Sequence, residues 1–323
     1  MNGSQLQPLG RCGVRVSRLG VGGGSLATSG GDRETTTMLD ACWRAGLRYY
    51  DTAPLYGESE ARLGLALAHH GRDDFVLSTK IGRLAAPVGE RRFDFSRNAI
   101  ERSLAESLLR LRTDYVDLVS VHDLTPAMLG DQHEHAKRDL LGSALDYLRA
   151  LKKQGVIRAL GIALYDSDAA VQLLDAASFD YVMIVGGYTL VCQSAADKLL
   201  PFCLARGIGV LLASPFHTGL LATGAVAGAR FNYRQAGAEM LDKVARIEAV
   251  CDRHAVALPA AALHFPLLHP AIASVVVGHR TPREVQANLD WLETPAPKAF
   301  WEDLVAEGVL PALKPLAPAV AGF

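Results

Sequence analysis

The sequence of 323 residues has few of the features that mark specialised classes of protein. Its five cysteines are scattered and form no CxxC pair, which is typical of reduced thiols rather than of a disulfide framework. Lysine and arginine number 33 against 34 aspartate and glutamate, so no excess of positive charge favours nucleic acid or an anionic membrane. No apolar run approaches the roughly 20 residues that span a bilayer.

Residues 1–13, MNGSQLQPLGRCG, also lack the apolar core of a signal peptide. Half of the sequence is hydrophobic and 21% is charged, so the chain can bury a substantial core and is not expected to be disordered. We therefore expect a soluble, cytoplasmic globular protein that acts on small molecules and has no nucleic-acid or membrane partner. The composition indicates no particular oligomeric state.

Short β-rich runs alternate with segments of helical periodicity along the whole chain. The expected strands lie near 17–22, 47–51, 75–80, 115–122, 159–162, 181–185, 209–213 and 273–277. The amphipathic segments lie near 34–45, 59–69, 96–111, 140–154, 167–176, 195–206 and 239–254. Strands that alternate with helices imply crossover connections and a parallel sheet.

Eight such units suit a closed (β/α)₈ barrel, or TIM barrel, which takes about 250 residues plus insertions. The rival is a doubly wound open sheet, which usually carries GxGxxG after its first strand. Here Gly22, Gly23 and Gly24 follow that strand without such a motif. We predict a single α/β barrel domain over residues 1–323, with an N-terminal β-hairpin at 6–16 and extra C-terminal helices. Only the proline-rich tail at 295–318 is expected to be loosely held.

Polar side chains mark the ends of three neighbouring expected strands. The second runs into RYYDTAPLYG, which contributes Asp51 and Tyr56, and the third ends in VLSTK, which contributes Lys80. The fourth ends in LVSVHD, which contributes His122 and Asp123. Active sites of such barrels gather at the C-terminal ends of the strands. We therefore expect Asp51, Tyr56, Lys80 and His122 to meet at one mouth of the barrel.

These residue types have a physical reason to share a site. A phenol with a pKa of about 10 is a poor acid–base catalyst at neutral pH. The ammonium of Lys80 would lower the pKa of Tyr56, and the carboxylate of Asp51 would hold that ammonium in place. The imidazole of His122 could donate a hydrogen bond to a carbonyl oxygen. Together with an external hydride carrier, this set predicts interconversion of carbonyl and alcohol.

The same stretches resemble the aldo-keto reductase family. The matching segments, in the family's order, are LGVGG, GLRYYDTAPLYGESEARLGLAL, VLSTKIG, DLVSVHD, ALGIA, ASPFHTGLL and VVVGHRTPREVQANL. The resemblance implies a (β/α)₈ barrel that binds NAD or NADP in an extended form. It implies Tyr56 as proton donor or acceptor, Asp51 and Lys80 as the groups that tune it, and His122 as the group that orients the carbonyl. The chain looks most like the L-fucose and D-threo-aldose 1-dehydrogenases and pyridoxal 4-dehydrogenase.

The resemblance also implies a cofactor site along the later strands. Backbone amides at the start of the helix after the eighth strand suit an anionic phosphate. The implied residues around the adenosine half are Gly278, His279, Arg280, Glu284 and Asn288. Those implied along the pyrophosphate are Ser214, Phe216, Gly219 and Leu220, and Gly23 is assigned to the cofactor site as well.

The choice between the two dinucleotides depends on opposing charges. A carboxylate at Glu284 can accept hydrogen bonds from a ribose hydroxyl and would repel a 2′-phosphate, which favours NAD. The guanidinium of Arg280 could grip that phosphate, which favours NADP. We predict NAD as the preferred cofactor and NADP as the alternative.

The chain departs from the family at the nicotinamide end. Ala163 and Leu164 stand where many relatives carry Ser-Asn, a usual Gln is replaced near Val185, and a usual aromatic residue is Ala213. The nicotinamide pocket is therefore expected to be less polar and roomier than usual. Tyr188 or Phe216 could supply an aromatic face, although core packing is the ordinary role of either.

Two further residues are assigned to the substrate pocket. Phe93 follows the third strand, and Asp123 either binds a sugar hydroxyl or caps the loop after the fourth strand. His133 and His135 resemble a metal pair, but no cysteine or strand-end carboxylate accompanies them, so we expect them in the long loop after the fourth strand. No metal site is predicted.

The function that these observations predict is oxidation of an aldose of the L-fucose or D-threo type to its lactone with NAD, with Tyr56 taking the hydroxyl proton. One alternative is an NADPH-dependent aldehyde or ketone reductase, because the same residues serve both directions. Others are a pyridoxal 4-dehydrogenase type of enzyme and a non-catalytic binding barrel. A metal-dependent hydrolase is disfavoured, because the first strand ends in glycines rather than in His-x-His.

Overall fold

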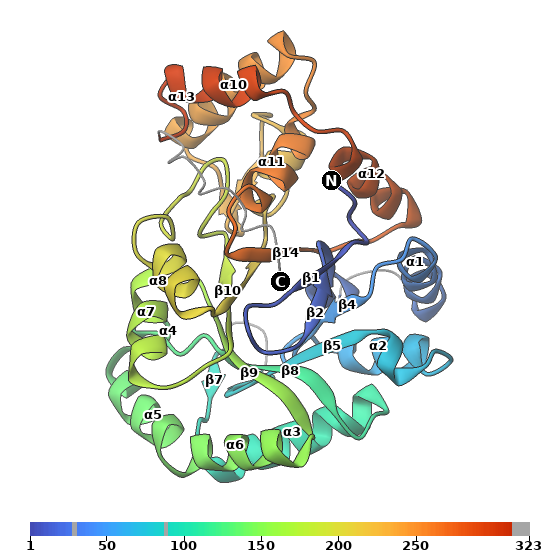
Figure 1. The fold of residues 1–323 in the computed structure, drawn as a ribbon, viewed down its shortest axis with the longest axis vertical. Helices are drawn as coiled ribbons and strands as arrows, with labels where there is room; N and C mark the ends of the chain where they lie inside the picture. Colours follow the sequence, from blue (N-terminus) through green and yellow to red (C-terminus); the bar gives the residue numbers. More distant parts are fainter. Residues whose placement is uncertain (28–30, 87–89, 312–323) are drawn as a thin grey trace.

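The computed structural model describes residues 1–27, 31–86 and 90–311 of the chain. A closed barrel of parallel strands forms its centre (Figure 1), which confirms the predicted fold class. Around the barrel the order is β10, β11, β14, β3, β4, β5, β8 and β9, and β9 pairs with β10 to close it. These strands are β3 (Leu19–Gly22), β4 (Tyr49–Asp51), β5 (Val76–Ile81), β8 (Val116–His122), β9 (Ile157–Leu164), β10 (Tyr181–Val185), β11 (Gly209–Ala213) and β14 (Ile272–Val277).

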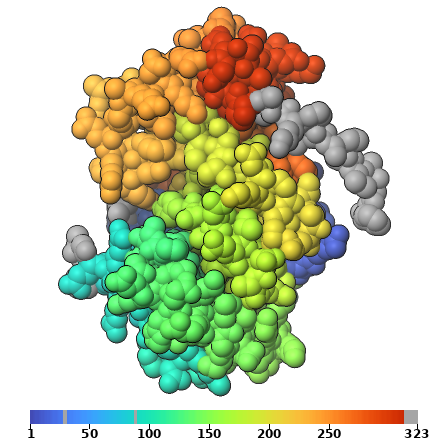
Figure 2. Space-filling view, turned by 90° about the vertical axis from the view of Figure 1, so that its left-hand side faces the viewer, coloured from blue at the N-terminus to red at the C-terminus, as the bar shows by residue number. Residues whose placement is uncertain are grey.

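Helices connect successive barrel strands and form the outer layer. Those of the described part of the chain are α1 (Asp32–Arg44), α2 (Ser59–Leu67), α3 (Arg97–Leu111), α4 (Pro126–Leu129), α5 (His133–Asp139), α6 (Leu145–Gln154), α7 (Ser167–Ala176), α8 (Leu199–Arg206), α9 (Leu220–Thr223), α10 (Ala238–Arg253), α11 (Leu258–Leu267), α12 (Pro282–Glu293) and α13 (Lys298–Ala306). On the side that carries α5, α7 and α8, segments coloured from cyan through green and yellow to orange and red make up most of the surface (Figure 2). In the described ranges, no helix combines the length and apolar character that crossing a bilayer requires.

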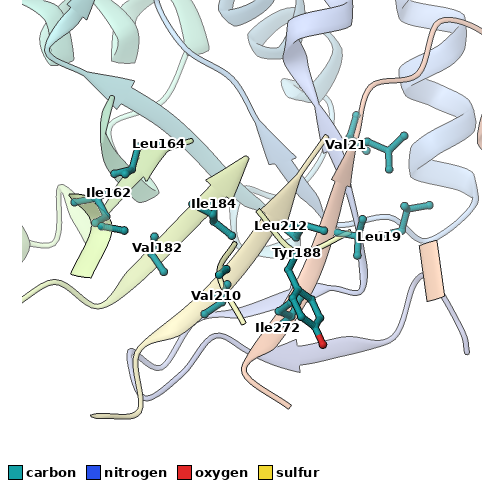
Figure 3. Close-up of a cluster of buried hydrophobic side chains, with 14 of the residues drawn as sticks. Leu19, Val21, Ile162, Leu164, Val182, Ile184, Tyr188, Val210, Leu212 and Ile272 are labelled. Atoms are coloured by element: carbon teal, nitrogen blue, oxygen red, sulfur yellow. The ribbon is translucent and has the colours of Figure 1, made fainter. Parts of the chain in front are cut away.

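Side-chain alternation along the strands separates two cores. Every second residue of a strand points to the same face. The side chains labelled in Figure 3 belong to the larger core, between the barrel and the helices; on β10 they are Val182 and Ile184. Tyr181 and Met183, their neighbours on the same strand, belong to a smaller core that fills the barrel itself.

The hairpin of β1 (Leu6–Pro8) and β2 (Arg15–Ser17) supplies the rest of the inner core. Leu9, Val14 and Val16 pack there with the barrel residues, and all three are buried. The backbone N–H of Arg11 donates to the carbonyl of Gly207, just before β11, at 2.9 Å. The hairpin therefore closes the end of the barrel at which the strands begin.

Two local expectations were wrong. The tail expected to be loosely held contains α13, whose Phe300 and Trp301 are buried against α10 and α11. The apolar side chains of this stretch outweigh the prolines that flank it. His133 and His135 lie on the helix α5 rather than in a loop. The part of the tail from residue 312 onward lies outside the described residues.

Phe300 tests whether α13 belongs to the core. Its side chain is fully buried and contacts the ring of Trp301 at a centroid distance of 4.8 Å. We expect Phe300→Ala to lower the free energy of unfolding by about 3–5 kcal/mol, because it leaves a cavity. Leu109→Ala, on the exposed face of α3, is the control and should change it by less than about 0.5 kcal/mol. Urea denaturation measures both, and equal effects would show that α13 contributes no core packing.

Candidate active site

Strand alternation places the predicted polar residues inside the barrel. Asp51 follows the inward Tyr49 by two residues on β4, and Lys80 is likewise an even number of residues from the inward Val76 on β5. His122 shares the inward face of β8 with Leu118. All three lie in the last two residues of their strands, so they meet at the open mouth.

A buried ion pair forms the centre of this mouth. Lys80 Nζ donates to Asp51 Oδ2 at 2.6 Å and to the carbonyl of Thr52 at 2.9 Å. Ser78 Oγ donates to the other oxygen of the Asp51 carboxylate, so both of its oxygens are engaged. Burial acts to lower the pKa of Lys80, but the charges of Asp51 and Tyr56 outweigh it and the pKa is raised. Lys80 therefore carries a permanent positive charge.

The loop that carries Tyr56 is fixed by the motif that contains it. Thr52 Oγ1 donates to Ser59 Oγ at 2.8 Å, and the backbone N–H of Ser59 donates to the carbonyl of Tyr56 at 3.0 Å. Glu60 is fully buried; it accepts from Thr79 Oγ1 on β5 and from Arg110 Nε on α3. Each polar residue of DTAPLYGESE that anchors the loop thus has a partner, and the phenol is left as the side chain that faces the site.

Tyr56 stands between the ion pair and the histidine. The Lys80 ammonium lies 4.8 Å from the centre of its ring, and the ring of His122 meets it edge-on at 6.1 Å. Burial raises the pKa of Tyr56 above its ordinary value, although the Lys80 charge opposes this shift. The expected lowering by Lys80 is present, but burial outweighs it. In the protein without ligand, Tyr56 is therefore a protonated phenol that can donate its proton.

His122 is held neutral. Burial, together with the positive charges of Lys80 and Arg83, holds its pKa well below the ordinary 6.5. Its Nδ1 is buried without a hydrogen-bond partner in the described structure. An unpaired buried N–H costs more than an unpaired acceptor nitrogen, which favours the tautomer with the proton on Nε2. That nitrogen can then donate to a carbonyl oxygen, as predicted.

Asp123 is engaged in a second ion pair, with a residue that the sequence did not single out. Arg83 Nη1 donates to Asp123 Oδ2, and the same oxygen lies 3.8 Å from His122 Nε2. The Asp123 side chain is 2% exposed and that of Arg83 is 20% exposed. Arg83 pairs with Phe93 across the short ladder of β6 (Arg83–Leu84) and β7 (Arg92–Phe93), and its guanidinium lies over the Phe93 ring at 5.7 Å. The predicted substrate residues therefore lie together beside His122.

Sequence reasoning also missed two tyrosines of this mouth. Tyr165 follows β9, and burial together with the charges of Tyr233 and Asp123 raises its pKa. Tyr233, in the turn between β12 (Arg230–Phe231) and β13 (Arg234–Gln235), is 67% exposed. Tyr165 stands directly after ALGIAL at the end of the fifth barrel strand, so its position alone could have identified it. Tyr233 is brought there by a hairpin that no motif marks.

The predicted adenosine site contains polar atoms that lack partners. His279 is fully buried, and neither of its ring nitrogens has a hydrogen bond within the described structure. Asn288 Oδ1, on the inward face of α12, is buried and equally unpaired. Burial lowers the pKa of His279 to about 4, so its ring is neutral. Unpaired buried groups such as these are costly without a ligand, so this part of the site fits the base and ribose of a dinucleotide.

Glu284 occupies the start of α12. Its Oε2 accepts from the backbone N–H of Arg280 at 2.7 Å, while Thr281 Oγ1 caps the helix by accepting from the Glu284 N–H at 3.2 Å. Gly278 is exposed and lies against Ser25, where an added Cβ would come within 3.1 Å. The Glu284 carboxylate thus already accepts the hydrogen bond of the Arg280 N–H, which a phosphate at the start of α12 could otherwise accept.

The loop after β11 is fixed by a buried histidine. His217 Nε2 is 2.7 Å from Thr189 Oγ1, and its Nδ1 is 3.0 Å from Asn232 Oδ1. This clamp holds the segment that contains Ser214 and Gly219, both of which have positive φ. Leu220 begins α9 and is buried. The four predicted pyrophosphate residues lie on one short, rigid segment, which the structure brings to the same end of the barrel as His122.

The residues predicted to face the nicotinamide are apolar and lie at the ends of two barrel strands. Ala163 and Leu164 are buried at the end of β9, and Ala213 at the end of β11 is half-buried. Tyr188 is packed against Phe265 with ring centroids 4.8 Å apart, so it belongs to the core. Phe216 meets Trp291 on α12 edge-on, toward the adenosine side. Neither ring replaces the missing aromatic residue.

Gly23 has a structural reason to be glycine. An added Cβ would lie 2.6 Å from the carbonyl oxygen of Asp51 and 2.5 Å from Ser59 Oγ. The close approach keeps the loop of Tyr56 in place, and cofactor contact by Gly23 stays a prediction. In the described ranges, no group of three or more His, Cys, Asp or Glu side chains could hold a metal ion.

Comparisons with known proteins match this geometry. The aldo/keto reductase family model matches residues 18–306. D-threo-aldose 1-dehydrogenase of a Pseudomonas species is 37% identical over 93% of this chain and 96% of its own length. Pyridoxal 4-dehydrogenase of Microbacterium luteolum is 31% identical over 96% of this chain and 99% of its own length.

Solved structures agree with the fold. A solved structure of an aldo-keto reductase from Bacillus halodurans superposes with a TM-score of 0.75, at 25% identity, over 98% of both chains. Enzymes of this family use nicotinamide cofactors. The chain, with its barrel and its Asp51–Lys80 pair beneath Tyr56, belongs to the aldo/keto reductase family.

Proposed function

We propose that this protein is an NAD(P)-dependent dehydrogenase that oxidises the hemiacetal carbon of an aldose to a lactone. The observation that carries the proposal is the set of Tyr56, Lys80, Asp51 and His122 at one mouth of the barrel. The similarity to a D-threo-aldose dehydrogenase over nearly the whole chain supports the substrate class.

When bound, the dinucleotide would accept the hydride at its nicotinamide ring. The protein then has one proton to move and one oxygen to hold. Tyr56 takes the proton of the substrate hydroxyl as its phenolate, which the Lys80 ammonium stabilises. His122 Nε2–H points a hydrogen bond at the same oxygen as it becomes a carbonyl. Asp51 keeps Lys80 in position, and its own oxygens are both occupied.

Cofactor preference follows from the start of α12. The Glu284 carboxylate accepts from the Arg280 amide, so a 2′-phosphate placed there would meet a negative charge and lose one donor. His279 and Asn288 would meet the adenosine half through their unpaired atoms. We propose NAD as the preferred cofactor, with Ser214, Phe216, Gly219 and Leu220 beside the pyrophosphate.

A second candidate is reduction of an aldehyde with the same residues. The raised pKa of Tyr56 favours it, because a protonated phenol donates to an oxygen that gains a hydride. The similarity to pyridoxal 4-dehydrogenase also supports an aromatic aldehyde, or the hemiacetal that it forms, as a substrate class. The catalytic assignment is the same in each case.

Tyr56→Phe should remove the proton-transfer step and keep the ring. We expect kcat for oxidation of an aldose to fall by about 10²- to 10⁴-fold, while quenching of tryptophan fluorescence by NADH stays as in the parent protein. Tyr147→Phe, on α6 outside the site, is the matched control and should keep full activity. A Tyr56→Phe protein with parental kcat would refute the assignment of the proton donor.

The pKa shifts of Tyr56 and His122 predict different pH profiles for reduction and for oxidation. Reduction needs the Tyr56 phenol, whose pKa is raised above 10.0, and His122, whose pKa below 6.5 keeps it neutral. We expect kcat/KM for reduction to be flat between pH 6.5 and pH 10. Oxidation needs the phenolate, so its kcat/KM should rise by about tenfold per pH unit until the phenol ionises. Initial rates in constant-ionic-strength buffers measure both profiles; an acidic limb near 6.5 in reduction would contradict the neutral His122.

Glu284 should control cofactor choice. Titration with NADH and with NADPH, followed through fluorescence that includes Trp291 on α12, should show tighter binding of NADH. Glu284→Gln removes the charge, and we expect the ratio of the two dissociation constants to shift toward NADPH by about fivefold. Glu293→Gln, at the other end of α12, should leave the ratio unchanged. Tighter NADPH binding by the parent protein would give Arg280 the deciding role.

A further inference from the structure

One carboxylate oxygen links His122 to a guanidinium that no motif predicts. Asp123 Oδ2 accepts from Arg83 Nη1 and lies 3.8 Å from His122 Nε2. Since Nδ1 of His122 is buried, Nε2 is the ring nitrogen that can reach a ligand. A substrate oxygen held by Nε2 therefore has its neighbouring carbon atoms beside the Arg83–Asp123 pair.

The pair has hydrogen-bonding capacity that the fold does not use. In the described part of the chain, Nε and Nη2 of Arg83 and Oδ1 of Asp123 have no hydrogen-bond partner. Arg83 is four-fifths buried and lies over Phe93, so its guanidinium is held in one place rather than spread through solvent. Donors and an acceptor thus stand side by side at a fixed position next to the reacting atoms.

Asp123 is also held in a strained backbone conformation. Its φ is +55°, a value that residues other than glycine seldom adopt, and its N–H donates to the carbonyl of Ala163 on β9 at 2.9 Å. Strain of this kind persists where the surrounding structure fixes it and is concentrated at ligand sites. In this conformation the carboxylate lies against Arg83 and His122.

We propose that the Arg83–Asp123 pair is a specificity element that reads the hydroxyl groups on the carbon atoms next to the reacting carbonyl. This inference rests on the proposed function and names its substrate class as 2-hydroxy and 2,3-dihydroxy carbonyl compounds. A hydroxyl both donates and accepts, so one can donate to Asp123 while its neighbour accepts from Arg83. The phenyl ring of Phe93 packs against the guanidinium of the pair.

The charge balance favours hydroxyls over a carboxylate at this position. Asp123 already neutralises Arg83, and a substrate carboxylate would approach the Asp123 carboxylate at close range; Arg91, whose charge also acts on Asp123, is exposed to solvent. The unused N–H groups of Arg83 belong to a charged guanidinium, and hydrogen bonds from charged groups are stronger than those between neutral groups. A neutral polyol therefore gains from the pair, while an acid does not.

The test compares glyceraldehyde with propanal, two three-carbon aldehydes that differ in their hydroxyls. Reduction of each is measured with the dinucleotide that binds more tightly, and the readout is the ratio of their kcat/KM values. The variant R83M/D123N removes both charges together, which avoids a buried unpaired carboxylate. We expect this ratio to fall by about 10- to 100-fold, mainly through KM for glyceraldehyde.

A matched control removes an ion pair far from the site. Arg206 and Asp175 form an exposed pair between α8 and α7 at 3.1 Å, and R206M/D175N should keep the parental ratio. Asp123→Asn alone, which keeps the shape of the side chain, should lower the ratio in the same direction and serves if the double variant fails to fold. Thermal unfolding of each variant checks its fold.

Each result has one meaning. An unchanged ratio in R83M/D123N, with both aldehydes still reduced, would overturn the specificity role and leave the proposed function intact. A selective loss of activity toward glyoxylate would make Arg83 an anion receptor and would also overturn it. Absence of both aldehyde reduction and aldose oxidation by the parent protein, with either dinucleotide, would instead refute the proposed function, and the inference with it.

Discussion

The buried pair of Lys80 and Asp51 is the constraint on which the site depends. Charges removed from water are expensive, and a buried ion pair seldom stabilises a fold more than well-packed apolar groups would. Removing either partner would leave an unpaired charge among β4, β5 and β8, at a cost of about 3–5 kcal/mol. The pair therefore matters through its effect on Tyr56: it holds an ammonium under the phenol, whose charge opposes the rise in pKa that burial causes and stabilises the phenolate when it forms.

The barrel makes this pair possible by its strand alternation. Inward positions on β4, β5 and β8 begin apolar and become polar toward the mouth; on β5 the sequence runs from Val76 through Ser78 to Lys80. Ser78 donates to Asp51 and also lies 3.4 Å from the hydroxyl of Tyr49. A polar layer thus separates the packed interior from the charged rim, and each charge finds partners within its own layer.

Much of this arrangement could be predicted from the sequence, because it depends on local patterns. Strand alternation and the DTAPLYG segment indicated the barrel and the positions of Asp51, Tyr56 and Lys80. Arg83 could not be found in that way, since its partner Asp123 is 40 residues away and the β6–β7 ladder that aims it carries no pattern. Tyr233 reaches the mouth through a hairpin fixed by His217 and Asn232, which is equally non-local. The stability of α13 was missed because its prolines were given more weight than its aromatic residues.

Two ion pairs flank His122, and their unequal exposure gives them different roles. The Lys80–Asp51 pair is 2% and 6% exposed, and its contacts are with groups of the protein, so it acts on Tyr56 from within the fold. The Arg83–Asp123 pair keeps unused donors and an accessible guanidinium, so it can meet a ligand. Burial, together with both positive charges, keeps the imidazole neutral. A neutral histidine between a filled pair and an open one separates the proton-transfer half of the mouth from the half that recognises the substrate, so a change at Arg83 reaches the chemistry at Tyr56 only through the charge beside His122.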